Sequence, residues 1–274
     1  MPIITVITIN RNNAFGLKKT LKSIENQTSK DFEFIVIDGA STDESISLLQ
    51  TFQLSNLQTF KWVSEPDSGI YNAMNKAIKM ATGDYFLFIN SGDELANNEV
   101  IEKIHQDLLP ETELASGILT LINNENTKQL YPPTEISLSY CINSGLTHPN
   151  TLIRKSLFDK YGLYNESNKI VSDWEFFLIA AGLNNCNYQQ LDIQIAKFYQ
   201  DGISSFNKEL VNTEMQRVIK RIIPKTILKD LKKLEVLESL TSQPAYQMVQ
   251  QSNLINKLLL FIYKIRKRFK AYKD

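Results

Sequence analysis

The stretch that decides the fold is SEPDSGIYNAMNKAIKMATGDYFLFINSGDE, residues 64–94. It begins as a polar loop, continues with apolar residues at helical spacing, and ends in a short apolar run followed by a second polar loop. A helical pattern that leads into a short apolar run is typical of a βαβ unit, in which a crossover helix joins parallel strands. The apolar face of the expected helix comprises Ala73, Met74, Ala77, Ile78 and Ala81.

The same alternation extends over about the first hundred residues. Short β-branched runs alternate with helical patterns, and one helix face carries Leu17, Leu21 and Ile24. Runs that are apolar throughout are typical of strands covered on both faces. The sequence therefore predicts an α/β fold, a Rossmann-like, mostly parallel sheet flanked by helices. The expected strands are residues 3–9, 32–37, 60–63 and 85–89.

Further elements are expected along the chain, and the pattern changes after the loop at residues 132–133. After the second expected strand, Ser41 and Glu44 predict a capping box. The helix that follows is therefore expected to start near residue 42. Pro132 and Pro133 predict a loop. Beyond these, we expect helices over residues 98–109 and 173–183, strands over 114–122 and 191–199, and a helical tail from 208 that Pro224 and Pro244 divide into three pieces.

The composition excludes several classes of protein. The 30 Lys and Arg residues balance the 30 Asp and Glu residues, so no overall positive field favours nucleic acid. The two cysteines lack metal-site or disulfide-framework spacing, which fits a reducing compartment. No signal peptide is visible, and the longest apolar run, residues 258–263, is far shorter than a membrane span. We expect a cytoplasmic protein.

Four polar loops follow the expected strands, at the edge where ligands bind in open α/β sheets. No dinucleotide-binding or P-loop fingerprint occurs, and the chain has only two histidines for nucleophilic triads or metal sites. The loops are instead rich in Asp and Asn, whose oxygens suit Mg²⁺ or Mn²⁺ together with the phosphates of a substrate. These features indicate a nucleotide-type ligand. The loops are residues 8–12, 38–43, 64–69 and 90–94.

Five segments together resemble the family 2 glycosyltransferases of the GT-A fold, over residues 3 to about 206. They are TVITINRN (5–12), VIDGASTDES (36–45), the stretch 64–94, THPNTLIRKSLFDKYGLYNES (147–167) and VSDWEF (171–176). The resemblance implies a GT-A domain over residues 1–206 and a helical C-terminal extension over 207–274. Within that domain, residues 1–110 would bind the nucleotide and residues 111–206 the acceptor.

The resemblance also implies a nucleotide-sugar donor, most simply a UDP-sugar, and a divalent cation, Mn²⁺ or Mg²⁺. Asp93 would hold the cation in the segment NSGD, where Asn90 and Gly92 replace the usual acids. Asp38-Gly39 replaces the two consecutive acids of many members. The residues expected to bind the nucleotide are Thr8, Asn10, Arg11, Asp38, Ser41, Asp67 and Asn75.

For catalysis, an inverting transfer needs a base on the acceptor hydroxyl, and the resemblance assigns that role to Asp173. Trp174 would stack on an acceptor sugar, and His148 and Glu175 are weaker candidates for contacts to the acceptor or donor sugar. Residues 202–204 resemble a loop that closes over the donor. The structural alternatives are turn roles for Asp38 and Asp67, helix caps for Asp93 and Asp173, and a packing role for His148.

The tail ends in an apolar stripe and a basic cluster over residues 254–273. This pattern is typical of a helix on an anionic membrane surface, and a helix packed on its own domain or in a dimer is the alternative. The expected function is sugar transfer to a glycan or lipid-linked acceptor in cell-surface polysaccharide synthesis, with peripheral binding at the inner membrane face. A nucleotidyltransferase and a non-catalytic nucleotide-sugar-binding protein are the rival functions.

Overall fold

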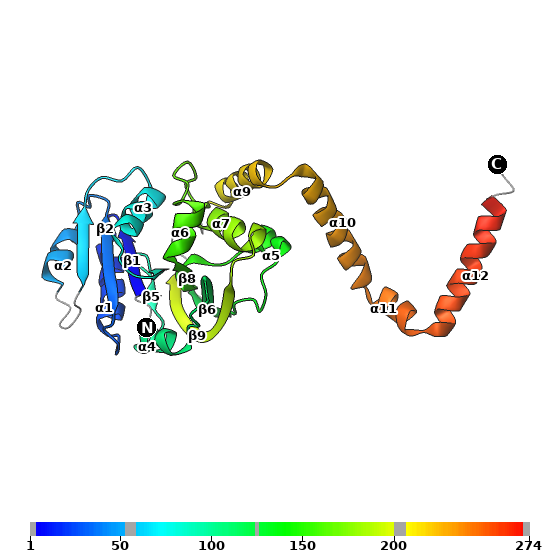
Figure 1. The fold of residues 1–274 in the computed structure, drawn as a ribbon, viewed down its shortest axis with the longest axis horizontal. Helices are drawn as coiled ribbons and strands as arrows, with labels where there is room; N and C mark the ends of the chain where they lie inside the picture. The colour runs from blue at the N-terminus through cyan, green and yellow to red at the C-terminus, as the bar shows by residue number, and fades with distance from the viewer. Residues whose placement is uncertain (1–3, 53–58, 124–125, 200–206, 271–274) are drawn as a thin grey trace. The chain divides into compact units, whose positions relative to one another are not determined.

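The computed structural model describes residues 4–52, 59–123, 126–199 and 207–270. The chain separates into two compact units, Met1–Ile219 and Lys220–Asp274 (Figure 1). The first unit contains one mixed sheet with helices on both sides, and the second contains only helices among its described residues.

The first part of unit 1 is a parallel sheet in the order β3-β2-β1-β4. The four strands lie within one residue of the predicted bounds, because continuous apolar runs of this length favour buried strands. The elements are β1 (Ile4–Asn10), α1 (Ala14–Glu25), β2 (Phe32–Asp38), α2 (Ser45–Thr51), β3 (Phe60–Ser64), α3 (Ile70–Met80) and β4 (Tyr85–Phe88).

The predicted capping box is wrong. Helix α2 begins at Ser45, and its N-cap, Glu44, makes no side-chain capping bond. The Ser41 hydroxyl donates to Asp38 Oδ1 at 2.6 Å, so it does not cap the helix. Asp43 Oδ1 accepts the amide of Ser45 at 3.0 Å instead. The Ser41 hydroxyl therefore hydrogen-bonds to the Asp38 carboxylate and not, as the local pattern predicts, to the backbone at the start of the helix.

The second part of unit 1 continues the sheet with antiparallel and parallel pairs in the order β4-β8-β6-β9-β5, and β7 pairs with β6. The predicted helix over 173–183 is α7 followed by a π-helical segment, η2, and Pro132 and Pro133 lie in a loop as expected. The elements are β5 (Glu94–Leu95), α4 (Val100–Asp107), β6 (Leu114–Ile122), β7 (Thr127–Leu130), α5 (Leu138–Asn143), η1 (His148–Asn150), β8 (Thr151–Arg154), α6 (Lys155–Tyr161), α7 (Ser172–Phe177), η2 (Leu178–Leu183) and β9 (Tyr188–Tyr199).

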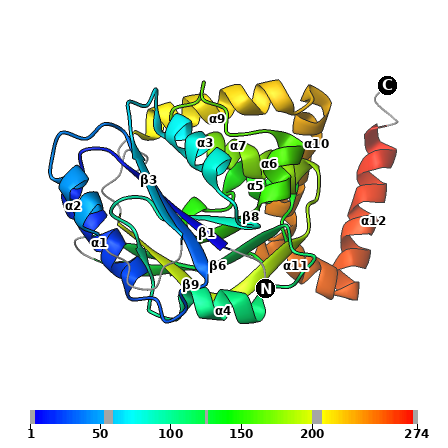
Figure 2. The ribbon, with the colours of Figure 1, turned by 60° about the vertical axis from the view of Figure 1, so that its left-hand side comes forward.

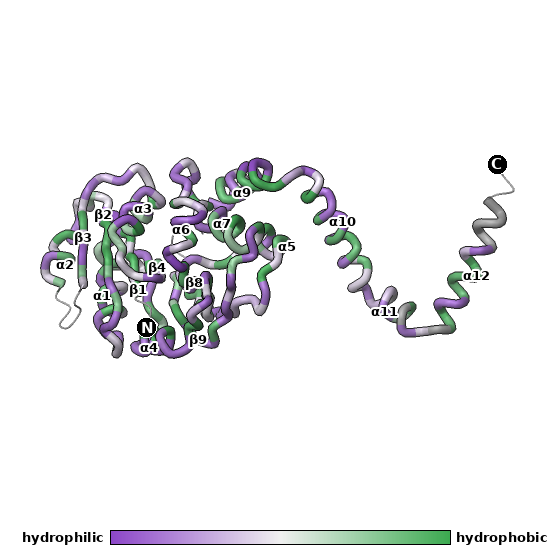
Figure 3. The backbone as a smooth tube through the Cα atoms, viewed as in Figure 1, coloured by the Kyte–Doolittle hydropathy of each residue, from purple (hydrophilic) through white to green (hydrophobic). Residues whose placement is uncertain are grey.

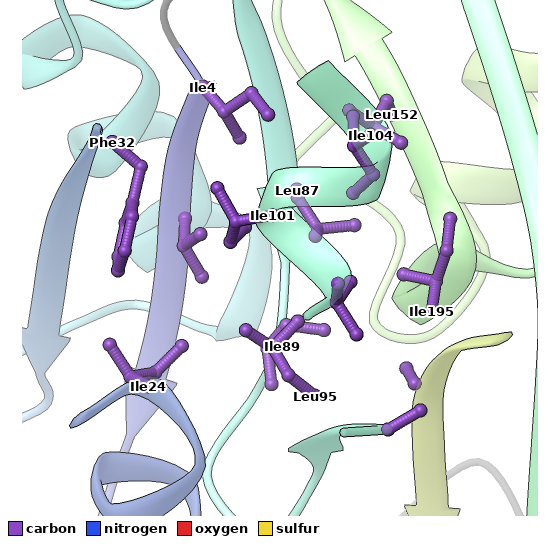
Figure 4. Close-up of a cluster of buried hydrophobic side chains, with 14 of the residues drawn as sticks. Ile4, Ile24, Phe32, Leu87, Ile89, Leu95, Ile101, Ile104, Leu152 and Ile195 are labelled. Atoms are coloured by element: carbon purple, nitrogen blue, oxygen red, sulfur yellow. The ribbon is translucent and has the colours of Figure 1, made fainter. Parts of the chain in front are cut away.

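One buried hydrophobic cluster joins the two parts of unit 1. Ile4 of β1 and Leu87 of β4 lie in one buried cluster with Leu152 of β8 and Ile195 of β9 (Figure 4). Helices α1 and α4 contribute to this cluster, whereas α3 lies against β1 and β2, beside α6 and α7 (Figure 2). Because this cluster extends from β1 and β4 to β8 and β9, the strands of the two parts are held in one rigid frame.

The tail has four helices where three pieces were predicted. They are α9 (Lys208–Ile222), α10 (Lys225–Thr241), α11 (Pro244–Gln251) and α12 (Asn253–Lys270), so the chain breaks at Ser252 as well as at Pro224 and before Pro244. Most of α9 belongs to unit 1, and it buries Glu214, Val218 and Ile219.

Unit 2 buries none of the side chains of α10. Hydrophobic and hydrophilic residues alternate along its helices (Figure 3). Many of its large apolar side chains are exposed, and Leu254 is 82% exposed. Within the described ranges, no helix combines the length and apolar character needed to cross a membrane.

Candidate active site

Polar side chains gather where β1, β2 and β3 end, because these parallel strands place Asn10, Asp38 and Ser64 in register. Asp38 is fully buried and accepts four hydrogen bonds. Its Oδ1 accepts from Asn10 Nδ2 at 2.7 Å and from the Ser41 hydroxyl at 2.6 Å. Its Oδ2 accepts the Ser41 amide at 2.9 Å and the Ser64 hydroxyl at 2.7 Å. Both carboxylate oxygens are thus engaged within the protein.

Asp38 is ionised and organises this pocket. Burial raises the pKa of its carboxyl, but the donated hydrogen bonds outweigh burial and leave the pKa below its ordinary value. In the described part of the chain, the buried Asn10 Oδ1 has no hydrogen-bond partner. An unsatisfied buried acceptor is costly, and it is suited to an N–H donor of a ligand. Asp38 is therefore more than a turn residue, because its carboxylate joins Asn10, Ser41 and Ser64 by hydrogen bonds.

Arg11 and Asp67 flank Gly39. A Cβ atom at Gly39 would lie 3.0 Å from Asp67 Oδ2 and 3.2 Å from Arg11 Cδ. An acidic side chain at position 39 would therefore be repelled by the Asp67 carboxylate. That carboxylate accepts a 2.6 Å hydrogen bond from Lys76 Nζ. Thr8 is buried, and its hydroxyl donates to the Ile89 carbonyl at 2.7 Å.

Asn75 lies in α3 and uses its side chain to hold the loop that precedes α7. Its Oδ1 accepts the Tyr164 amide at 3.0 Å, and its Nδ2 donates to the Tyr164 carbonyl and to Glu166 Oε1, both at 2.9 Å. The structure therefore groups Asn75 with residues of the second part of unit 1, apart from the cluster of Asn10, Asp38 and Ser41.

The turn from Asn90 to Asp93 fits a divalent cation. Thr20 of α1 holds this turn, because its hydroxyl donates to the Asp93 carbonyl at 2.7 Å and accepts the Gly92 amide at 3.1 Å. Asn90 Oδ1 is buried and has no hydrogen-bond partner within the described ranges. Amide and carboxylate oxygens are ligands that Mg²⁺ and Mn²⁺ accept. Asp93 does not cap α4, whose N-cap is Glu99.

The described residues contain no group of three or more His, Cys, Asp or Glu side chains placed to hold a metal. A cation at the turn 90–93 would therefore complete its coordination with substrate phosphates and water, as Mg²⁺ commonly does.

Asp173 stands in the first turn of α7, and the N-cap of that helix is Val171. Its Oδ1 accepts a 2.6 Å hydrogen bond from the Tyr71 hydroxyl of α3. Sequence reasoning did not identify Tyr71, although its place two residues after the loop 64–69 put it near the carboxyl edge of the sheet.

His148 lies beside this pair inside an aromatic cluster. The ring is 7% exposed, stacks on Phe88 with centroids 4.4 Å apart, and places Nε2 2.9 Å from the Tyr164 hydroxyl. Burial lowers the pKa of His148, and the nearby charge of Asp173 opposes this effect in part. His148 is therefore a neutral, packed histidine of the aromatic cluster.

We expect His148 to make folding sensitive to acid. Its pKa is lowered in the folded state, so below about pH 6.5 the unfolded chain binds a proton that the folded chain resists. The stability that neutral His148 contributes is complete above that pH and is lost as the pH falls. The free energy of unfolding of His148→Gln should depend less on pH than that of the wild type, by up to about 1.4 kcal/mol per pH unit. Urea denaturation from pH 8 to pH 5 measures this, and parallel curves would contradict it.

Trp174 and Glu175 face the protein interior. The Trp174 indole is buried and donates to the Cys141 carbonyl at 2.7 Å, so its ring is not exposed for stacking. Glu175 Oε2 accepts hydrogen bonds from Asn165 at 3.3 Å and Asn168 at 2.5 Å. Both residues hold α7 in place in this structure.

The sheet is mostly parallel and carries the buried carboxylate of Asp38 at its carboxyl edge, with the oxygen-rich turn 90–93 after β4 and with Asp173 hydrogen-bonded to α3. This arrangement is that of a GT-A type α/β transferase. The family model described as "Glycosyl transferase family 2" matches residues 5–162, more than half of the chain. The chain belongs to glycosyltransferase family 2.

Relatives with curated names support this assignment. The chain is 31% identical to an uncharacterized glycosyltransferase of Mycobacterium tuberculosis over 211 residues, which are 74% of this chain and 78% of that protein. It is 26% identical over 175 residues to a PGL/p-HBAD biosynthesis glycosyltransferase of Mycobacterium bovis, covering 64% of this chain and 68% of that protein.

Two solved structures share the fold. S. aureus TarS in complex with UDP-GlcNAc aligns with a TM-score of 0.62 and 19% identity, covering 83% of this chain and 69% of that one. The mannosyltransferase PcManGT of Pyrobaculum calidifontis, in complex with GDP-Man and Mn²⁺, aligns with a TM-score of 0.57 and 14% identity. The latter alignment covers 90% of this chain and 82% of that chain. The donor-closing loop predicted at residues 202–204 lies outside the described residues.

Proposed function

We propose that this glycosyltransferase moves a sugar, with inversion and with a divalent cation, from a UDP-sugar to a glycan or lipid-linked acceptor in cell-surface polysaccharide synthesis. The observation that carries the proposal is the place of Asp173 in the first turn of α7, within hydrogen-bonding distance of α3 at the carboxyl edge of the sheet. A fold neighbour bound to UDP-GlcNAc supports a nucleotide-sugar donor, and a relative named a PGL/p-HBAD biosynthesis glycosyltransferase supports sugar transfer.

In the proposed reaction, Asp173 takes the proton of an acceptor hydroxyl as its oxygen attacks the anomeric carbon of the donor sugar. The new glycosidic C–O bond forms while the bond from that carbon to the diphosphate breaks, and UDP leaves with the electron pair. This single displacement inverts the anomeric carbon. Asp93 and Asn90 would hold the cation, which neutralises the charge that grows on the diphosphate.

Nucleotide binding is assigned to the strand-end loops. Asn10 Oδ1 has no partner among the described residues and would accept an N–H of the base, while Asp38 keeps the Asn10 amide group in that orientation. Arg11, beside Asp67, would contact the nucleotide from the rim of the pocket. Thr8 and Ser41 would act mainly by fixing the loop backbone. A direct contact of Asn75 with the nucleotide is the weakest of these assignments.

Calorimetric titration with UDP, with and without Mn²⁺, tests the proposal, with GDP as the matched control ligand. We expect UDP to bind more tightly than GDP and Mn²⁺ to increase the affinity. A nucleotidyltransferase would instead bind a nucleoside triphosphate and release pyrophosphate. A non-catalytic relative would bind UDP-sugar without consuming it.

Charge is divided unevenly between the two units, although the whole chain is neutral. Residues 220–274 hold thirteen basic and four acidic residues, a net charge of +9, and residues 1–219 hold seventeen basic and twenty-six acidic residues, a net charge of −9. With exposed apolar side chains on α10 and α12, the basic unit 2 suits an anionic membrane surface. We propose a peripheral position at the cytoplasmic face of the membrane, where lipid-linked acceptors would be presented.

Deletion of residues 254–274 should therefore move the protein from anionic liposomes into the supernatant in a sedimentation assay. Each basic residue near the surface contributes about 1 kcal/mol to such binding, and salt screens this attraction. Neutral phosphatidylcholine liposomes are the control and should bind the full chain weakly. If the full chain does not bind anionic liposomes at low salt, the membrane role is wrong. A truncation that then lowers the melting temperature would show that the tail packs on its own domain, and one that lowers the oligomeric state would show that it forms a dimer contact.

A further inference from the structure

Tyr71 and Asp173 form a contact that the proposed reaction does not use. Tyr71 lies at the start of α3, in the nucleotide-binding half, and Asp173 lies in α7, 102 residues further along. The Tyr71 side chain is 4% exposed, and its hydroxyl is 2.6 Å from Asp173 Oδ1. Burial and the charge of Asp173 raise the pKa of Tyr71 well above its ordinary value. The phenol therefore remains protonated and donates.

The neighbourhood holds the Tyr71 ring in place. The ring packs against Tyr164 with centroids 5.6 Å apart, and the backbone of Tyr164 is tied to α3 by the Asn75 side chain. Asn72, one residue after Tyr71, donates to Glu166 Oε2 at 2.9 Å. Helix α3 and the loop that precedes α7 therefore form one cross-braced unit around the Tyr71 hydroxyl.

We propose that Tyr71 is a positioning residue for the base: it holds Asp173 Oδ1 so that Oδ2 accepts the proton of the acceptor hydroxyl. This inference rests on the proposed role of Asp173. Because α3 directly follows the loop 64–69 at the nucleotide edge, the hydrogen bond also sets the base relative to the donor. A rigid first contact of this kind reduces the reorganisation needed in the transition state.

The test compares the wild type, Tyr71→Phe, Asp173→Asn and the double variant. Loss of a hydrogen bond to a charged group should lower the kcat of Tyr71→Phe by about 10- to 100-fold. The KM for the donor and the affinity for UDP should stay within about twofold, because binding does not use this contact. The pH–rate profile of Tyr71→Phe should differ from that of the wild type, because the variant removes a hydrogen-bond donor to the reacting carboxylate.

Tyr85→Phe is the matched control. Tyr85 is equally buried, its hydroxyl donates to the Thr112 carbonyl, and it lies at the opposite end of β4 from the site. This variant should lose stability and keep kcat. Expressing kcat per UDP-binding site removes the effect of any unfolded fraction. If Tyr71→Phe does not fold, 3-fluorotyrosine at position 71 keeps the contact with a stronger donor, and the pH–rate profile should again differ from that of the wild type.

The outcomes separate this inference from the proposed function. In the Asp173→Asn background, Tyr71→Phe should lower kcat no further, because Tyr71 acts through the carboxylate. An unchanged kcat and pH profile in Tyr71→Phe, with Asp173→Asn inactive, would overturn the positioning role and keep the base. An equal loss in both backgrounds would also overturn it. Full activity of Asp173→Asn would overturn the proposed base itself.

Discussion

Asp173→Asn should lower kcat by about 100- to 10,000-fold, the range that a general base contributes, while UDP affinity changes little. The amide keeps the shape of the carboxylate and can still accept the hydrogen bond from Tyr71, so the local structure should persist. It cannot take a proton from the acceptor hydroxyl. Steady-state transfer kinetics, together with calorimetry for UDP, separate the two effects.

Asp159→Asn is the control for this variant. Asp159 is an exposed aspartate of α6, away from the sheet edge, and the substitution should leave kcat unchanged. If Asp173→Asn retains near-normal kcat, or if it loses UDP binding in parallel with kcat, Asp173 is not the base and its contact with Tyr71 is structural.

Asp93→Ala should remove the gain in UDP affinity that Mn²⁺ provides. In the proposed site, Asp93 is the carboxylate that holds the cation against the diphosphate, so kcat should also fall, on the order of 100- to 1,000-fold. Metal-free UDP affinity should change little, because Asn10 and the loops around Asp38 are untouched. Calorimetric titration with UDP, with and without Mn²⁺, measures the metal-dependent gain and the metal-free affinity.

Glu99→Gln provides the matched control for Asp93→Ala. Glu99 is an exposed acid a few residues away and pairs with Lys103 at 2.8 Å. Its loss should not affect the Mn²⁺-dependent affinity. If Asp93→Ala keeps the full effect of Mn²⁺, the cation must be held elsewhere.

The regular elements could be predicted where a single physical effect dominates. Continuous apolar runs gave β1 to β4 within one residue, because burial alone selects such strands. The capping box failed because Ser41 had two possible partners, and the local pattern could not weigh the buried carboxylate of Asp38 against the helix end. The break at Ser252 has no proline to mark it, so the pattern of the tail did not reveal it.

The candidate site was predictable only in part. Asn10, Asp38 and Ser41 do lie together, because parallel strands bring consecutive loops to one edge. The sequence could not show that Asp38 is saturated by internal hydrogen bonds, or that Asn75, Trp174 and Glu175 point to protein partners. The contact between Tyr71 and Asp173 depends on the packing of two helices distant in sequence, which no local motif encodes.

Sugar transfer from a nucleotide-sugar is the activity on which the residue roles above depend. It can be measured as UDP release from a panel of UDP- and GDP-sugars with Mn²⁺, followed by NMR of the anomeric configuration of the first product. We expect at least one UDP-sugar to be consumed, the reaction to depend on Mn²⁺ and on Asp173, and the anomeric configuration to be inverted. Binding of UDP without consumption of any donor, or a product with retained configuration, would contradict this expectation.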